Sequence, residues 1–198
     1  MRKLKITGNI LIILGLIFVF LLAYLEVLPR YSQYAMKKNI WGKQMATPLN
    51  KSQRKQKPLK IERKGPDKNQ LGVLIIPKIK IEQVVLYDAT VSNLSIGPSL
   101  IKSTAYPGTV GNSAIAGHRV SHGFPFRNID KLSQGDKIIF KNSSGQVEYF
   151  VKKKFRVVPS DTSVLNKTSY PQITLLACDP PFSAKYRLAV VAVGDFEK

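Results

Sequence analysis

The stretch Ile173-Thr174-Leu175-Leu176-Ala177-Cys178-Asp179-Pro180 decides how the rest of this chain is interpreted. It begins as an apolar run that favours a β-strand, and it ends abruptly at a polar turn that contains proline. Cys178 is the only cysteine of the sequence, and it lies where the predicted strand meets a loop. A single cysteine is usually a small buried apolar residue, so its position alone does not define a reactive thiol.

The N-terminus predicts a membrane anchor. Arg2, Lys3 and Lys5 precede an uncharged span, residues 6–25, which is dominated by Ile, Leu, Phe and Val. About twenty residues, at roughly 1.5 Å rise each, cross a hydrocarbon core about 30 Å thick. A cleaved signal peptide is the alternative, but residues 26–30 lack a small-residue cleavage pattern. We therefore expect an uncleaved single-pass helix in the cell membrane, with the N-terminus inside and the rest of the chain outside.

The charge of the chain is strongly positive. Its 31 Lys and Arg against 12 Asp and Glu give a formal net charge of +19, which favours attraction to nucleic acid, an anionic membrane face or an acidic wall polymer. Much of the excess lies in residues 42–69, which are rich in Lys, Gln, Pro and Asn and are expected to form a solvated spacer. Because these residues follow a predicted membrane span and lack interleaved aromatics, we expect no nucleic-acid partner.

The chain divides into three predicted regions. Residues 1–26 form the cytoplasmic tip and the anchor, residues 27–70 a basic stalk outside the membrane, and residues 71–198 a folded domain. Within the stalk, residues 31–41 are expected to form a short helix near the membrane surface, with Tyr and Trp side chains at the interface.

Short apolar or alternating runs recur through the third region and predict an all-β domain. They cover residues 71–76, 79–86, 113–116, 137–141, 147–157, 173–177 and 188–193, with a hairpin loop at 142–145. Only short helices are expected, around residues 91–94 and 125–132. Strands at this spacing are typical of a closed or nearly closed β-barrel.

Three side chains are candidates for chemistry. If the last two apolar runs pair as a hairpin, Cys178 faces Arg187 across the mouth of the loop 179–185, where opposed positions lie about 5 Å apart. His118 follows the run 113–116 after a single glycine, at a strand end like that of Cys178, whereas the second histidine, His122, lies further into the loop. A neighbouring imidazolium or guanidinium favours the nucleophilic thiolate form of a cysteine. These residues show no recognisable zinc spacing, so no metal or other cofactor is expected.

An exported domain usually carries cysteines in pairs as disulfides. One unpaired thiol outside the membrane is therefore a packing residue, an intermolecular linker or a reactive group.

The segment Thr174-Leu175-Leu176-Ala177-Cys178, with His118 upstream and Arg187 downstream, resembles the sortases, membrane-anchored cysteine transpeptidases of Gram-positive bacteria. The resemblance covers residues 71–198 and implies a closed sortase-type barrel of about eight strands. It implies that Cys178 is the nucleophile, that His118 transfers protons and that Arg187 stabilises the oxyanion or holds the substrate. The family motif is Thr-Leu-x-Thr-Cys, and Ala177 stands where its second threonine is expected. The resemblance places Ala177, His122 and Ala116 along the substrate groove.

Three segments are similar to class E sortases, the housekeeping enzymes of actinobacteria: Gly117-His118-Arg119, the run from His122 to Phe126, and the run from Cys178 to Ala184. Those enzymes prefer a Leu-Ala-x-Thr-Gly sorting signal and commonly carry tyrosine where this chain has His122. The resemblance implies cleavage of a Leu-Ala or Leu-Pro type of signal between Thr and Gly. It further implies that surface proteins bearing such a signal are the substrates and that an amine of a peptidoglycan precursor is the acceptor.

Other classes of protein remain as alternatives. A pilin-polymerising class C sortase usually has a lid ahead of its barrel, and residues 42–69 contain no convincing lid. Another kind of cell-wall cysteine transpeptidase places Ser-His-Gly close to its cysteine, whereas Ser121-His122-Gly123 lies far from Cys178 in sequence. A non-enzymatic basic wall-binding domain is a different class, in which replacing Cys178 would leave the function intact.

Overall fold

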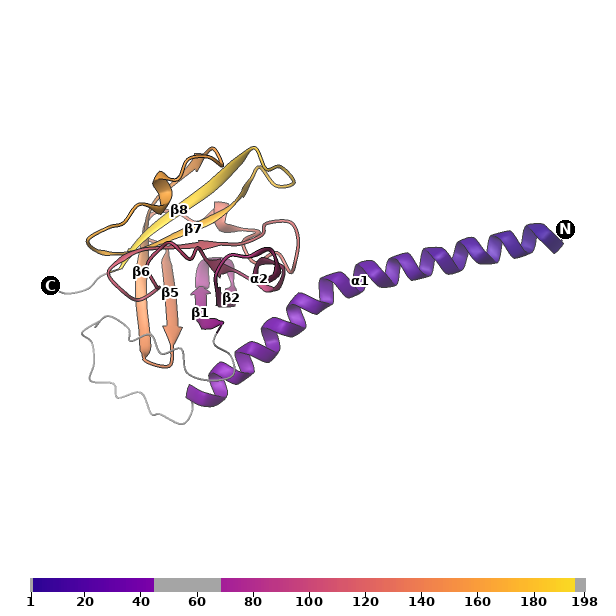
Figure 1. The fold of residues 1–198 in the computed structure, drawn as a ribbon, viewed down its shortest axis with the longest axis horizontal. Helices are drawn as coiled ribbons and strands as arrows, with labels where there is room; N and C mark the ends of the chain where they lie inside the picture. Colours follow the sequence, from indigo (N-terminus) through magenta and orange to yellow (C-terminus); the bar gives the residue numbers. More distant parts are fainter. Residues whose placement is uncertain (1, 45–68, 195–198) are drawn as a thin grey trace.

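The computed structural model describes residues 2–44 and 69–194, in which a long N-terminal helix leads to a closed β-barrel (Figure 1). The helices are α1 (Arg2–Gln44) and α2 (Val91–Ile96), and short 3-10 turns cover Pro77–Ile79, Ile129–Lys131 and Ser163–Leu165. The strands are β1 (Gln70–Ile76), β2 (Ile81–Tyr87), β3 (Ser99–Leu100), β4 (Gly111–Ala116), β5 (Lys137–Asn142), β6 (Gly145–Val157), β7 (Pro171–Asp179) and β8 (Tyr186–Gly194). The predicted closed barrel of about eight strands is confirmed.

The barrel closes in the order β1-β2-β3-β4-β7-β8-β6-β5, with β5 returning to β1. Most neighbours are antiparallel, but β2–β3 and β4–β7 run parallel. Parallel neighbours need a long connection, and here the chain leaves β4, builds β5 and β6, and only then returns as β7. As a result, segments about sixty residues apart in sequence end at the same rim of the barrel.

The barrel interior is filled by one apolar cluster. Tyr149, Phe126 and Phe140 are its largest side chains, and all are at most 1% exposed. The Tyr149 hydroxyl accepts a hydrogen bond from the Gly108 N–H at 2.7 Å, so its buried oxygen has a partner. Burial raises the pKa of Tyr149 well above its usual value, although the Gly108 hydrogen bond opposes that shift. Tyr149 therefore acts as a neutral packing residue.

Several predicted elements differ from those observed. The run 79–86 starts its strand only at Ile81, because Pro77–Ile79 forms a 3-10 turn that ends at Lys80 with a left-handed φ of 55°. The helix expected over residues 125–132 is only the 3-10 turn Ile129–Lys131, whereas α2 extends to Ile96 beyond the predicted 91–94. Strand β3 was not expected from the sequence, since two residues carry no periodicity.

The first helix is longer than expected. Because α1 runs to Gln44, the predicted boundary at residue 26 falls inside it, and residues 31–41 belong to α1 instead of forming a separate short helix. Its most apolar 18-residue window has a mean hydropathy of 2.9 and is not buried in the protein, so α1 is long and apolar enough to cross a membrane. Residues 45–68, which contain most of the predicted spacer, lie outside the described residues.

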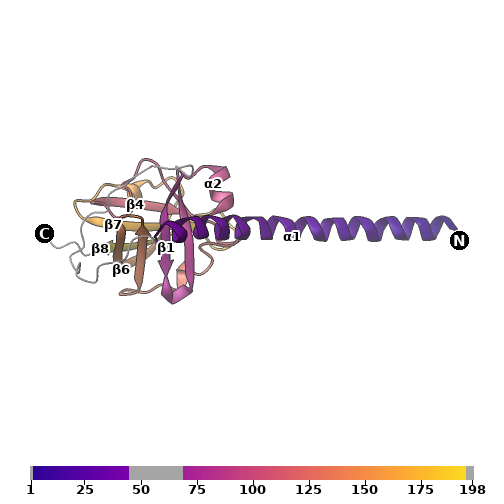
Figure 2. The same ribbon diagram turned by 90° about the horizontal axis from the view of Figure 1, so that it is seen from below.

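The second half of α1 lies against the barrel. Figure 2 shows that the C-terminal half of α1 crosses the barrel near β1, whereas the N-terminal half extends away from the barrel as a free helix. Met36 and Ile40 pack on an apolar cluster formed by Val73 of β1 with Val84 and Leu86 of β2. Part of the outer face of β1 and β2 is therefore covered by Met36 and Ile40 of α1.

The backbone at Gly117 is packed so closely that a side chain there should destabilise the fold. A Cβ added to Gly117 would lie 2.6 Å from Phe126 Cδ2, inside the core. We expect Gly117→Ala to lower the free energy of unfolding by about 1–3 kcal/mol, measured by urea denaturation, because overpacking a core forces neighbours to shift. The double variant with Phe126→Leu should recover part of that loss. Strictly additive costs would contradict this account of the contact.

Candidate active site

Cys178 lies one residue before the end of β7 and is half-buried. In the antiparallel pairing of β7 with β8, its register partner is Arg187. The hairpin predicted from the sequence is therefore present with the expected register. Opposed positions in an antiparallel pair have Cβ atoms about 5 Å apart, so the Cβ atoms of Cys178 and Arg187 are neighbours.

His118 is brought to the same rim by the parallel partner of β7. Strand β4 pairs with β7 up to Ala116 opposite Leu176, and the next N–H, of Gly117, donates to the Leu176 carbonyl at 3.0 Å. His118 and Cys178 therefore each lie two residues beyond a paired position on adjacent strands. Both line one groove together with Arg187, as the sequence predicted.

The two histidines are stacked on each other. The ring centroids of His118 and His122 are 4.9 Å apart, and the ring planes are inclined by 29°. Burial lowers the pKa of His118 below its ordinary value of 6.5, and the neighbouring charge of His122 lowers it further. The neutral imidazole is therefore the main form of His118 near neutral pH, and the imidazolium is a minor form.

Arg187 is oriented by the backbone of its own loop. Its Nη1 donates hydrogen bonds to the carbonyl oxygens of Ala184 at 3.1 Å and Tyr186 at 3.2 Å. These bonds tie one arm of the guanidinium to the loop between β7 and β8, while the side chain still lines the groove. A fork-shaped donor held in this way can direct further N–H groups towards an oxyanion beside Cys178.

The groove at this rim has a volume of about 310 Å³. It lies between the ends of β4 and β7, α2, and the connection from β6 to β7 that contains the turn Ser163–Leu165. Ala116 and Ala177, both predicted along the substrate groove, line it, whereas His122 is placed beside it through the stack on His118. Its wall residues are Leu94, Ile101, Ala116, Gly117, Val157, Val158, Pro159, Asp161, Thr162, Val164, Leu165, Leu176 and Ala177.

The groove wall from β6 to β7 was missed by the sequence analysis, and a buried amide holds it in place. Asn112, which is 2% exposed, donates through Nδ2 to the carbonyl oxygens of Val164 at 2.8 Å and Asn166 at 3.2 Å. Its Oδ1 accepts a hydrogen bond from Thr174 Oγ1 at 2.8 Å. The threonine of the Thr-Leu-x-x-Cys segment thus supports the groove from inside instead of lining it.

An ion-pair cluster, with Arg119 and Asp179 buried at its centre, connects the ends of β4 and β7. Arg119 follows His118 in sequence and is 4% exposed, and its Nη1 contacts Asp179 Oδ1 at 2.6 Å while its Nη2 contacts Asp130 Oδ1 at 2.8 Å. Asp179 follows Cys178, and its other oxygen pairs with Arg156. This cluster was not expected from the sequence, although both charges directly follow residues predicted to be catalytic, Arg119 after His118 and Asp179 after Cys178.

The structure thus places a thiol, an imidazole and a guanidinium along one groove at the rim of a closed β-barrel. The model of the sortase domain matches residues 74–195, and the chain belongs to the sortase family. This result confirms the family predicted from the residues around Cys178, His118 and Arg187.

Similar relatives span several sortase classes. Sortase A of Listeria monocytogenes is 30% identical over 129 residues, which are 65% of this chain and 57% of that protein. Sortase SrtE1 of Streptomyces coelicolor is 41% identical over an alignment of 100 residues, and the match covers 44% of this chain and 28% of that protein. The chain thus spans little more than half the length of the first of these relatives, and much less of the second. The predicted similarity to class E is supported by the second relative.

Solved structures show the same fold. A sortase D5 transpeptidase of Clostridium perfringens aligns with a TM-score of 0.64 and 26% identity over 86% of this chain and 98% of that chain. A variant of sortase E from Streptomyces avermitilis aligns with a TM-score of 0.59 and 27% identity over 64% of this chain and 88% of that chain.

Removing the second histidine should change the pH dependence of the reaction. In His122→Asn the nearby charge is gone and the stacked ring no longer covers His118, so the pKa of His118 should rise. We expect the acidic limb of the kcat/KM profile to move to higher pH, together with the NMR titration of the His118 ring. Ser121→Ala, in the same loop, is the control and should leave both curves in place. An unchanged His118 titration in His122→Asn would disprove the coupling.

Removing Asp179 from the ion-pair cluster should lower the free energy of unfolding. Asp179→Ala leaves Arg119 and Arg156 without a shared partner, and loss of one member of a buried pair typically costs about 3–5 kcal/mol. We expect the free energy of unfolding to fall by a similar amount, or by somewhat less because Asp130 still pairs with Arg119.

The matched control for this experiment is Lys102→Ala. It breaks the Lys102–Asp88 pair, which is 3.9 Å long and whose side chains are 65% and 38% exposed. An exposed pair of this kind contributes at most about 1 kcal/mol. Equal losses in the two variants would show that the Asp179 cluster has no special role in stability.

Proposed function

We propose that this chain is a membrane-anchored cysteine transpeptidase that cleaves a C-terminal sorting signal between Thr and Gly and joins the protein to an amine of a cell-wall precursor. The observation that carries the proposal is the meeting of Cys178, Arg187 and His118 at one barrel rim, which results from the register of β7 with β8 and of β7 with β4. The catalytic roles given to these three residues are part of the proposal.

In the first half of the reaction the Cys178 thiolate attacks the carbonyl carbon of the threonine. A C–S bond forms, and the negative charge that develops on the carbonyl oxygen is stabilised by Arg187. The C–N bond to glycine then breaks, and the leaving amine takes a proton from the His118 imidazolium. The product is a thioester between the substrate threonine and Cys178.

In the second half the acceptor amine attacks the thioester carbonyl. The neutral His118 now accepts the proton that this amine loses, so the same imidazole serves as acid and then as base. The C–S bond breaks, Cys178 leaves as the thiolate, and the new amide joins the threonine to the acceptor. Protons and charges balance over the cycle, because His118 ends as the imidazolium with which it began.

The lowered pKa of His118 limits the fraction of enzyme that is ready to react. The proposed cycle starts from an imidazolium beside a thiolate, whereas burial and His122 favour the neutral imidazole. Only a minor protonation state is then active near neutral pH. The same low pKa favours protonation of the leaving glycine amine, since a weakly basic imidazole gives an imidazolium that donates its proton readily.

The groove fits an extended peptide. It is lined mainly by apolar side chains, with Asp161 as its one acidic residue, and an adjoining hollow shares Leu94, Ile101 and Ala116 with it. Ala177, which stands where the family motif has a threonine, lines the groove next to Cys178 and is itself 3% exposed. We propose that this groove accepts a Leu-Ala or a Leu-Pro type of signal.

The apolar α1 supports an anchor in the cell membrane, with the barrel outside and the N-terminus inside. The main alternative is a sortase that polymerises pilins. Such a sortase usually has a lid ahead of its barrel, which in this chain would fall in residues 42–69, and most of these lie outside the described residues. A non-enzymatic wall-binding role makes no use of the thiol.

The proposal is tested by peptide turnover with the full chain in detergent. Quenched Leu-Ala-x-Thr-Gly and Leu-Pro-x-Thr-Gly peptides are incubated with an amine acceptor, and the ligated product is measured. We expect Cys178→Ala to abolish transfer, His118→Gln to lower kcat/KM about 10²–10⁴-fold and Arg187→Lys to lower kcat/KM about 10²–10³-fold.

Lys152→Ala removes a positive charge from an exposed position on β6 and should keep full activity. Normal turnover by Cys178→Ala would exclude the transpeptidase. Retained activity in Arg187→Lys would contradict only the role of the Arg187 guanidinium in stabilising the oxyanion.

A further inference from the structure

The barrel is fixed to α1 by a buried glutamine. Gln33 is 5% exposed, and its Nε2 donates to the carbonyl oxygens of Val84 and Ile96, both at 3.3 Å. Its Oε1 accepts a hydrogen bond from the Val84 N–H at 2.8 Å. A Cβ added to Gly97 would lie 2.0 Å from Gln33 Nε2, so the amide fills the space that Gly97 leaves open. These contacts attach the barrel to α1 at Gln33, at β2 and at the end of α2.

The catalytic histidine loop lies beside α1 just beyond its most apolar part. A Cβ added to Gly123 would lie 3.7 Å from Pro29 Cβ and 3.9 Å from Arg30 Cγ. Pro29 is four residues after Leu25, the end of the predicted span, which corresponds to about 6 Å along the helix. That distance is about the depth of the headgroup layer of a bilayer. His122, whose ring stacks on the catalytic histidine, precedes Gly123 and so lies near the membrane surface.

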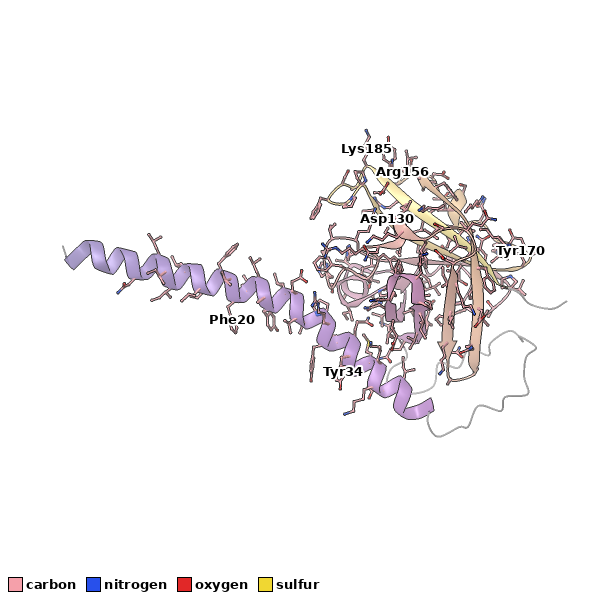
Figure 3. The ribbon with its side chains drawn as sticks, turned by 180° about the vertical axis from the view of Figure 1, so that it is seen from behind. Phe20, Tyr34, Asp130, Arg156, Tyr170 and Lys185 are labelled. Carbon is pink, nitrogen blue, oxygen red and sulfur yellow. The ribbon has the colours of Figure 1, made fainter. Side chains whose placement is uncertain are left out.

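The loop between β7 and β8 lies on the same side. Figure 1 shows this connection at the end of the barrel towards which the free half of α1 extends. Phe182, in this loop, is 88% exposed, and Lys185 is also exposed. Tyr170, at the opposite end of β7, is 46% exposed and is seen in Figure 3 on the side of the barrel away from the free half of α1.

From this arrangement we propose that the catalytic rim rests on the bilayer, with Phe182 inserted at headgroup level and Lys185 facing lipid phosphates. The inference rests on the proposed function for the membrane anchor, and it adds a second lipid contact that the anchor itself does not require. An apolar ring beside a basic residue is typical of an interfacial contact. A single exposed apolar residue is ordinary on a protein surface, and it is the place of Phe182 on the side of the barrel that faces the free half of α1 that indicates a lipid contact.

A contact of this kind would serve a substrate that is held in the same membrane. Because Gln33 fixes the barrel to α1, the groove cannot turn far from the bilayer. A membrane-held sorting signal would then meet Cys178 in a restricted layer, and its effective concentration at the groove would be raised. The effective concentration of a soluble peptide is not raised in this way. Loss of the lipid contact should therefore lower turnover of a membrane-held substrate only, whereas loss of the chemistry should lower turnover of both.

The first test places a spin label in the full chain, in nanodiscs of phosphatidylcholine and phosphatidylglycerol. The labelled variants are Phe182→Cys and, as the matched control, Tyr170→Cys, each combined with Cys178→Ala to remove the native thiol. We expect the label at 182 to be severalfold more accessible to oxygen, relative to a water-soluble nickel chelate, than the label at 170. Equal ratios at the two positions would overturn the proposal. Both labelled variants lack the Cys178 thiol and are not assayed for turnover, so this result does not depend on the proposed transpeptidase reaction.

The second test compares two substrates in the active enzyme. We expect Phe182→Ser to lower turnover of a lipid-linked sorting peptide in the same nanodiscs severalfold while turnover of the soluble peptide is unchanged. Phe182→Leu, which keeps an apolar side chain, should restore most of the lost turnover. Equal turnover of the lipid-linked peptide by Phe182→Ser and wild type would refute the lipid contact. Absence of soluble-peptide turnover in the wild type would refute the proposed function.

Discussion

The position of β7 between a parallel and an antiparallel neighbour is the constraint on which the site depends. The hydrogen bonds of β7 with β8 set Cys178 opposite Arg187, and those of β7 with β4 bring His118 to the same rim. A shift of one residue in either register would turn a side chain to the other face of the barrel wall. The three side chains therefore need no contact with one another to be aligned, because the sheet aligns them.

The charges behind the rim support the same arrangement. Arg119 follows His118, Asp179 follows Cys178, and their buried ion pair joins the ends of β4 and β7 where the strand pairing stops. Buried pairs often contribute little net stability, since removing two charges from water is costly. Their geometry is nevertheless demanding, and a pair at this place restricts how far the two strand ends can separate. We regard positioning, more than stability, as what the pair contributes to the site.

Local pattern predicted much of this structure. The alternation in residues 147–157 and the apolar runs beside Cys178 and Arg187 each identify a strand, and a short loop between two strands implies their pairing. The parallel pairing of β4 with β7 has no such local signal, because fifty-four residues separate Ala116 from Pro171. Ile79, the last residue of the turn Pro77–Ile79, is apolar like the strand that follows and was therefore assigned to it, and the two-residue β3 has no period to detect. The groove wall at 158–165 and the Arg119 cluster likewise depend on contacts distant in sequence.

Strand β3 is so short that the barrel wall beside β2 is completed partly by a side chain. It pairs with β2 only at Leu86 and Tyr87, and the Gln33 amide bonds the N–H and the carbonyl of Val84 as a neighbouring strand would. An unpaired N–H and carbonyl at a sheet edge can instead bind another extended chain. A soluble fragment that begins after residue 44 would lack this amide and would uncover the apolar face of Val73 and Val84. Self-association of such a fragment would then reflect the missing helix and would carry no information about the quaternary structure of the enzyme.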